Sequence, residues 1–267
     1  MMAIRFVELC QALMITDPIF YVFAVPATLL YGLSKGGMGG GLGLVAVPMM
    51  ALVISPSQAA AILLPILCVM DLFAVWGFRG VYDKANLRII LPASLLGIGV
   101  GAATYQYLSD DHIKLFVGLI ALVFALNWVL QQLRGRPPEA KPVSKIAGWI
   151  YGSIAGLTSF SVHAGGPPIN MYLLPQQMNK TVFVGTTVIF FTVVNYVKLI
   201  PYAWIGLLDS SNLMTSLALV ILAPIGVRLG MYMHHRINEG LFYWVCYVLL
   251  VAAGGKLMYD GLMGLIQ

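Results

Sequence analysis

Long apolar stretches separated by short polar turns make up almost the whole chain. Each is about 20 residues long, enough to cross roughly 30 Å of hydrocarbon as an α-helix. The strict alternation of polar and apolar residues that marks membrane β-strands is absent from them. The pattern therefore predicts an all-α polytopic membrane protein. The stretches are 57–78, 88–107, 112–131, 181–203, 212–233 and 240–262.

Two glycine-rich breaks interrupt this apolar pattern, at 34–41 and at 161–168. Backbone that leaves a helix inside a bilayer survives only where it is buried in protein or lines a cavity. A short helix that begins after each break would aim its free N–H groups and positive dipole end into that cavity, as membrane carriers do for anions. We therefore predict one anion-binding site near the bilayer midplane. Its two helix N-termini are expected on opposite sides, at Gly39, Gly40 and Gly41 and at Gly165 and Gly166.

The segments that follow the breaks are short. Residues 42–54 and about 166–177 provide only about 18–20 Å of helix, too little to cross a membrane without the preceding 18–34 and 145–160. Each short pair is either two thin crossings or a hairpin that dips into the membrane and returns. The sequence leaves both arrangements open.

Internal repetition divides the chain into two copies inside a single transmembrane domain. Repeat 1 covers about 18–132, a hydrophilic linker covers 133–144, and repeat 2 covers about 145–263. Each copy has two short and three long segments, an odd number, so we predict two inverted five-segment repeats with about 8–10 transmembrane segments. The repeated motifs are Tyr31-Gly32 with Tyr151-Gly152, Asp83-Lys84-Ala85-Asn86-Leu87 with Asp209-Ser210-Ser211-Asn212-Leu213, and Ile98-Gly99-Val100 with Ile225-Gly226-Val227.

Loop charges predict the orientation. The linker carries Arg134, Arg136 and Lys141, and short loops rich in Lys and Arg stay in the cytoplasm. Counting helices outward from the linker places the acidic turns at Asp110-Asp111 and at Asp209 outside, together with both termini.

Composition agrees with the membrane setting and excludes other classes. Hydrophobic residues make up 60% of the chain and charged residues only 9%, and the mean hydropathy is +0.90, whereas soluble domains carry about 25% charged residues. The net charge of +5 does not indicate nucleic-acid binding, because the basic residues are scattered through short loops. The three cysteines are isolated, so no metal and no cofactor is expected.

Polar side chains around the breaks are the candidate substrate ligands. Lys35 is the only formal cation in either break, so it is the candidate counter-charge for an anion, with snorkelling to the interface as its alternative. His163 is either a ligand or a neutral, hydrogen-bonded core histidine. The candidate donors are Ser34, Lys35, Ser159, Ser161, His163 and Asn170.

Asp71 is the candidate coupling residue. It interrupts an apolar run from 59 to 76, and an ionisable group there is a functional hypothesis by default. It could take up a proton or bind Na⁺. A structural hydrogen bond to Asn195, at the matching place in the second copy, is an equal alternative. Lys198 lies close to a segment end, where we expect snorkelling, and Gly152, Gly156, Gly226 and Gly230 fit close helix packing.

Three functional classes compete. A carrier needs repeats, broken helices and a polar site at the midplane, and the sequence predicts all three. An anion channel would use similar groups along an open path and stays open as an alternative. An intramembrane enzyme is disfavoured, because the chain has no His-Glu-x-x-His and no Gly-x-Ser-x-Gly motif.

The motifs around the second break also carry a resemblance to a known family. Gly165-Gly166-Pro167-Pro168 followed by Asn170-Met171-Tyr172-Leu173, with the two-copy layout, resembles the sulfite exporter TauE/SafE family over roughly 20–263. The resemblance implies a secondary carrier of sulfite, sulfoacetate or other organosulfonates in the bacterial inner membrane. A different small carboxylate-type anion, the coupling ion (H⁺ or Na⁺) and a homodimer are left open.

Overall fold

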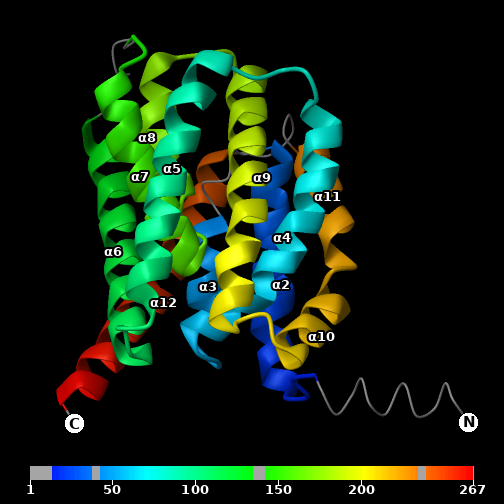
Figure 1. Ribbon diagram of the computed structural model, residues 1–267, viewed down its shortest axis with the longest axis vertical. Helices are drawn as coiled ribbons and strands as arrows, with labels where there is room; N and C mark the ends of the chain where they lie inside the picture. The colour runs from blue at the N-terminus through cyan, green and yellow to red at the C-terminus, as the bar shows by residue number, and fades with distance from the viewer. Residues whose placement is uncertain (1–13, 38–42, 135–141, 234–238, 267) are drawn as a thin grey trace, which may run out of the picture.

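The computed structural model describes residues 14–37, 43–134, 142–233 and 239–266, and these residues form a helical bundle without a strand (Figure 1). The all-α prediction is confirmed. The helices are α2 (Pro18–Gly37), α3 (Ala46–Met50), α4 (Pro56–Phe78), α5 (Lys84–Tyr105), α6 (Asp110–Arg134), α7 (Lys145–Val162), α8 (Gly166–Leu173), α9 (Lys180–Ile205), α10 (Ser210–Leu219), α11 (Leu222–Met233) and α12 (Glu239–Ile266), with 3₁₀ turns η1 (Gly43–Val45) and η2 (Leu174–Gln176).

Side-chain caps explain where several helices begin. The carboxylate of Asp83 accepts a hydrogen bond from the Asn86 N–H at the start of α5, at 2.6 Å, and Asp209 accepts one from the Asn212 N–H at the start of α10, at 2.8 Å. A cap of this kind satisfies an N–H group that the first helical turn leaves unpaired. The repeated Asp-x-x-Asn-Leu motif is therefore the same helix-start signal used twice.

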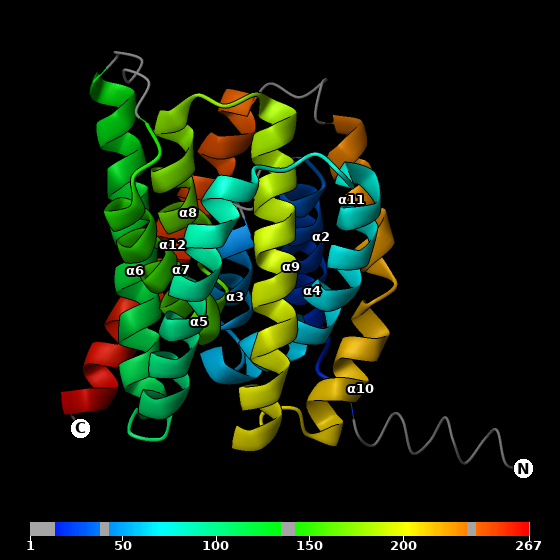
Figure 2. The same ribbon diagram turned by 45° about the horizontal axis from the view of Figure 1, so that its top comes forward.

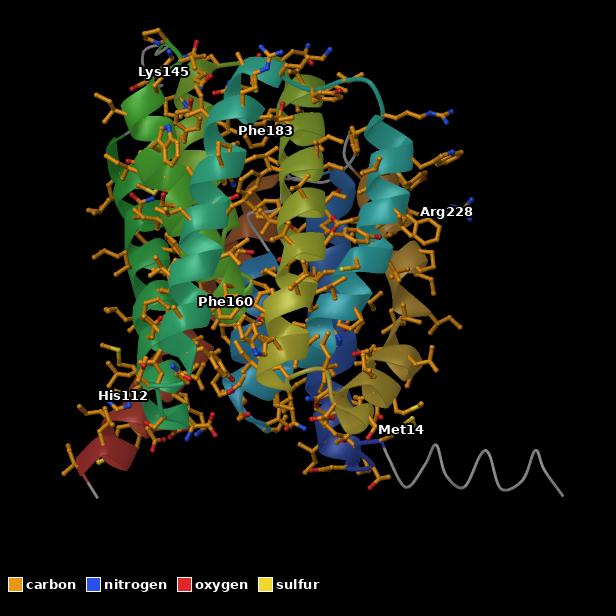
Figure 3. The ribbon with its side chains drawn as sticks, in the orientation of Figure 1. Met14, His112, Lys145, Phe160, Phe183 and Arg228 are labelled. Carbon is orange, nitrogen blue, oxygen red and sulfur yellow. The ribbon has the colours of Figure 1, made fainter. Side chains whose placement is uncertain are left out.

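The segments around the second break form a hairpin. Lys145 at the start of α7 and Phe183 in the first turn of α9 lie near the same end of the bundle, whereas Phe160 near the end of α7 lies deeper (Figure 3). Amide hydrogen bonds between Asn86 and Gln176, at 2.8 and 3.1 Å, hold η2 beside the start of α5 at that end. Helix α7 therefore runs from this end of the bundle into its interior, and α8 returns to the same end.

Five of the described helices, namely α2, α4, α5, α6 and α9, are long and apolar enough to cross a membrane. Helices α10 and α11 pass the same test together, with a bend of 45° between them. The sequence predicted one stretch at 212–233, and the structure divides it around Val220. Pro224 favours a break at this place, since a proline lacks the N–H that would bond the carbonyl four residues earlier and its ring clashes with that carbonyl.

Glycines bring α11 close to α2 and α7 close to α5. A Cβ on Gly226 of α11 would lie 3.0 Å from the Cα of Gly32 on α2, and a Cβ on Gly156 of α7 would overlap the carbonyl oxygen of Ser94 on α5. Such small residues let membrane helices approach backbone to backbone. The packing interpretation is confirmed for all four glycines to which it was applied, Gly152, Gly156, Gly226 and Gly230.

The pairing of helices follows the order that two copies would give. Helix α2 packs on α11 and α7 packs on α5, so the first helix of each copy contacts the fourth segment of the other. The third helices α4 and α9 pack together, as do the fifth helices α6 and α12. Figure 2 shows α9 in the middle of the bundle, with α6 and α12 to one side and α10 and α11 to the other. This exchange symmetry supports the inverted repeat, which stays a prediction.

The basic linker and the acidic turn at Asp110 lie at opposite ends of the bundle, as the orientation predicted from loop charges needs. Met14 and His112 lie at one end and Lys145 at the other (Figure 3). At the first of these ends, the hydroxyl of Ser57 at the start of α4 donates to Asp110 at 2.9 Å.

In a cysteine-free background, we expect a membrane-impermeant thiol reagent added to intact cells to label Tyr107→Cys, a position that is 77% exposed. Val143→Cys, at the linker end and 46% exposed, is expected to react only after the membrane is opened. Labelling of Val143→Cys from outside would contradict the orientation.

Candidate functional site

Helices α4 and α9 cross in the middle of the bundle and bring Asp71 and Asn195 together. Each of these residues lies fifteen positions after the first residue of its helix. The Asn195 side-chain amide donates to Asp71 Oδ2 at 2.7 Å, and both side chains are buried. The hydrogen bond to Asn195 that was one of the two alternatives for Asp71 is therefore present. It does not decide whether Asp71 also couples transport to an ion.

Lys35 lies in the last turn of α2 and forms an ion pair with Asp71 Oδ1. It is 4% exposed, and its ammonium group also lies 3.5 Å from the Leu67 carbonyl oxygen. The snorkelling alternative for Lys35 is therefore wrong. The carboxylate of Asp71 offsets the charge of Lys35, because the two are in direct contact in a buried setting where Coulomb attraction is strong.

Lys198 is a second buried cation, one helical turn beyond Asn195 on α9. It is completely buried, and its ammonium group donates to Ser159 O at 2.9 Å, Ser159 Oγ at 3.0 Å and His163 Nδ1 at 2.8 Å. The prediction that Lys198 snorkels to the interface is wrong. Helix α9 continues to Ile205, so Lys198 lies inside the span. Its three-residue spacing from Asn195 was the available signal, since such residues share a helix face.

His163 ends α7 at the second break. It adopts a left-handed backbone conformation with φ of 55°, and its Nε2 lies 2.8 Å from the Ala60 carbonyl oxygen of α4. A carbonyl only accepts, so Nε2 carries the proton, and an ammonium only donates, so Nδ1 accepts from Lys198. His163 is thus the neutral, hydrogen-bonded core histidine that was one of its two interpretations. The tautomer is assigned from these partners.

Tyr31 links the flanks of the two breaks. A Cβ on Gly43, the first described residue after the first break, would lie 2.6 Å from the Tyr31 ring, and the Tyr31 hydroxyl donates to the His163 carbonyl oxygen at 3.1 Å. The described flanks of both breaks therefore meet in the interior. Gly39, Gly40 and Gly41 lie outside the described residues, so the placement of the first helix N-terminus stays a prediction.

The remaining candidates have different surroundings. Ser34 is buried, and its Oγ accepts from the Gly43 N–H at 3.2 Å, across the first break. Ser161 donates to the Leu157 carbonyl within α7, at 3.0 Å, so its hydroxyl is used by its own helix. Gly165 caps α8, and a Cβ there would lie 2.8 Å from the Ala155 carbonyl oxygen. Gly166 is the first residue of α8, and the Asn170 side-chain oxygen is buried without a partner among the described residues.

We call Lys35, Asp71, Ser159, His163, Asn195 and Lys198 the buried polar cluster. Its members come from α2, α4, α7 and α9 and from the second break, and they include the charged side chains that are buried in a largely apolar core. Ionisable groups that face a bundle interior mark substrate or ion pathways in membrane proteins. Two cations against one carboxylate make the cluster suitable for an anion.

The bundle is that of an all-α polytopic membrane protein, and its buried charged cluster is of the kind found in transporters. The chain belongs to the sulfite exporter TauE/SafE family, whose model matches residues 24–257. This match confirms the resemblance seen in the sequence and makes the protein a member of a transporter family. Neither the comparison with curated proteins nor that with solved structures finds a match.

Proposed function

We propose that this protein is a secondary transporter that moves small sulfur-containing anions, such as sulfite, sulfoacetate or other organosulfonates, across the bacterial inner membrane. The observation that carries the proposal is the buried polar cluster, which has two lysines and one carboxylate where the flanks of both breaks meet. Sulfonate and sulfite groups present three acceptor oxygens, which hydroxyl, ammonium and backbone N–H donors can match. Family membership supports the same class of substrate.

The ligands come from both breaks in this proposal. Ser159 and the N-terminus of α8 are proposed to lie on one side of the anion, with Ser34 and Gly39 to Gly41 on the other. His163 contributes by holding Lys198 rather than as a direct ligand, because both of its ring nitrogens are bonded. Asn170 is proposed as a further donor from α8, because its side-chain amide carries two N–H donors and no hydrogen bond fixes its oxygen among the described residues.

Asp71 is the proposed coupling residue. Within the described part of the chain, it is the only fully buried carboxylate, and it is held by Lys35 and Asn195. A proton or Na⁺ that competes with Lys35 for this carboxylate would change the charge of the cluster. Uptake driven by a pH gradient alone would identify H⁺ as the coupling ion, and a requirement for a sodium gradient would identify Na⁺.

Flux through reconstituted vesicles tests the carrier mechanism. We expect uptake of labelled isethionate to saturate and to rise when the vesicles are preloaded with unlabelled isethionate, because a carrier returns faster when it is loaded. Acetate in the preload is expected to have little effect. Flux that does not saturate would favour the anion channel, and stimulation by acetate equal to that by isethionate would favour a general carboxylate-type carrier.

A further inference from the structure

The buried polar cluster contains three formally charged side chains, and two of them cancel. Lys35 and Asp71 are in direct contact as an ion pair. His163 is neutral, because one of its nitrogens accepts from Lys198 and the other donates to the Ala60 carbonyl. When Lys198 is protonated, the excess positive charge of the cluster therefore belongs to it.

The ammonium group of Lys198 has a hydrogen-bond acceptor for each of its donors, but no carboxylate pairs with it among the described residues. The three N–H donors of its ammonium group match three neutral acceptors, two on Ser159 and one on His163. Among the described residues, no ion pair joins Lys198 to a carboxylate. A buried charge without a counter-ion is costly, and an anion beside it removes that cost.

We infer that Lys198, rather than Lys35, is the cation that faces the transported anion, and that its single charge selects singly charged sulfur oxyanions over doubly charged ones. This inference rests on the proposed function, because it assumes that an anion binds at the buried polar cluster. It narrows the substrate class to species such as hydrogen sulfite and the monosulfonates, and disfavours the sulfite dianion and sulfoacetate.

The geometry of α9 explains the discrimination. Asn195 and Lys198 are three residues apart on one face of α9, and Asn195 holds the carboxylate of Asp71 at 2.7 Å. An anion beside Lys198 is therefore about one helical turn from the Lys35–Asp71 ion pair, which has no cation to spare for it. A monoanion is neutralised by Lys198 alone. A dianion retains one unpaired charge in a buried setting, because Asp71 already offsets the charge of Lys35.

Wild-type protein gives the direct test. Methanesulfonate and sulfate both present three oxygens on sulfur and differ in whether a methyl group or a fourth, charged oxygen completes the group. In calorimetric titrations we expect methanesulfonate to bind about tenfold or more tightly than sulfate, a factor that corresponds to about 1.4 kcal/mol. Equal affinity, or tighter binding of sulfate, would overturn the inference and leave the proposed function standing.

Chloride separates the charge rule from the choice of substrate. If chloride binds as tightly as methanesulfonate while sulfate binds weakly, the charge rule holds and the proposed sulfur-anion substrate fails. If methanesulfonate binds at least about tenfold more tightly than both, the charge rule and the proposed substrate class are both supported.

Three variants assign the charge to Lys198. Lys198→Met is expected to weaken methanesulfonate binding by about tenfold or more. Lys256→Met removes the same charge from an exposed position, paired with Asp260, and serves as the matched control. Asp71→Asn adds one net positive charge to the cluster, so its preference for methanesulfonate over sulfate is expected to fall by about tenfold. Wild-type affinity in folded Lys198→Met would overturn the inference.

Discussion

Asp71→Asn is expected to lower the free energy of unfolding by about 3–5 kcal/mol. Breaking a buried ion pair on one side leaves the other charge without a partner, and this loss is much larger than the net contribution of the pair. Here the remaining charge would be Lys35, which is 4% exposed in the last turn of α2. Reversible unfolding of the purified protein in mixed micelles, followed by tryptophan fluorescence, measures the change.

A double-mutant cycle controls for the loss of packing. Lys35→Met combined with Asp71→Asn removes both charges, so the double variant is expected to regain most of the stability that Asp71→Asn loses. The pair is in direct contact, and residues in contact are those whose effects fail to add. Losses that simply add in the double variant would show that the ion pair is not formed in the membrane protein as described.

Gly97→Ala is expected to destabilise the protein by about 1–3 kcal/mol or more, because an added methyl group has no room between α5 and α7. A Cβ at Gly97 would overlap the carbonyl oxygen of Ser153, which is backbone and cannot rotate away. Overpacking of a tight contact forces backbone shifts of this energetic size. The same micelle unfolding measurement gives the result.

Gly99→Ala, two residues further along α5, is the matched control. A Cβ at Gly99 meets nothing within 4 Å, so the substitution is expected to be neutral or to stabilise by up to about 1 kcal/mol through helix propensity. Equal effects of the two substitutions would contradict the close packing of α5 on α7. A milder effect of Gly97→Ala alone would show that the helices separate easily there.

Much of the fold was readable from the sequence because it depends on local or one-dimensional properties. Hydrophobic length predicts helices that can span a bilayer, and the structure has them. The repeated Asp-x-x-Asn-Leu motif encodes a helix cap at Asp83 and again at Asp209, each within three residues of its partner. Spaced glycines such as Gly226 and Gly230 indicate close packing, although not which helix is the partner.

Two features were harder to predict from the sequence. They are the division of 212–233 at Val220 and the hairpin form of α7 and α8. A proline inside an apolar run either kinks a helix or is absorbed, and α4, α5 and α9 each contain an internal proline without being divided. A helical segment of about 18–20 Å can either form part of a thin crossing or return to the side that it entered from, and its length alone does not decide between the two. Packing of α7 against α5, and of α8 back against α7, decides the path of the hairpin.

The roles of the two buried lysines depend on tertiary structure alone. From the sequence, Lys35 was the isolated cation and Lys198 a residue near a segment end. In the fold, Lys35 is paired with Asp71, which lies 36 residues away in the sequence. Lys198 instead donates to two neutral oxygen atoms of Ser159, which lies 39 residues away in the sequence. The sequence determined that charged and polar groups lie within membrane-spanning helices, because an apolar stretch of about 20 residues crosses the bilayer and carries any charged residue inside it to that depth. Only the packing of α2, α4, α7 and α9 decided which lysine is paired with a carboxylate and which is not, because Coulomb energy depends on distances in space between residues far apart in the chain.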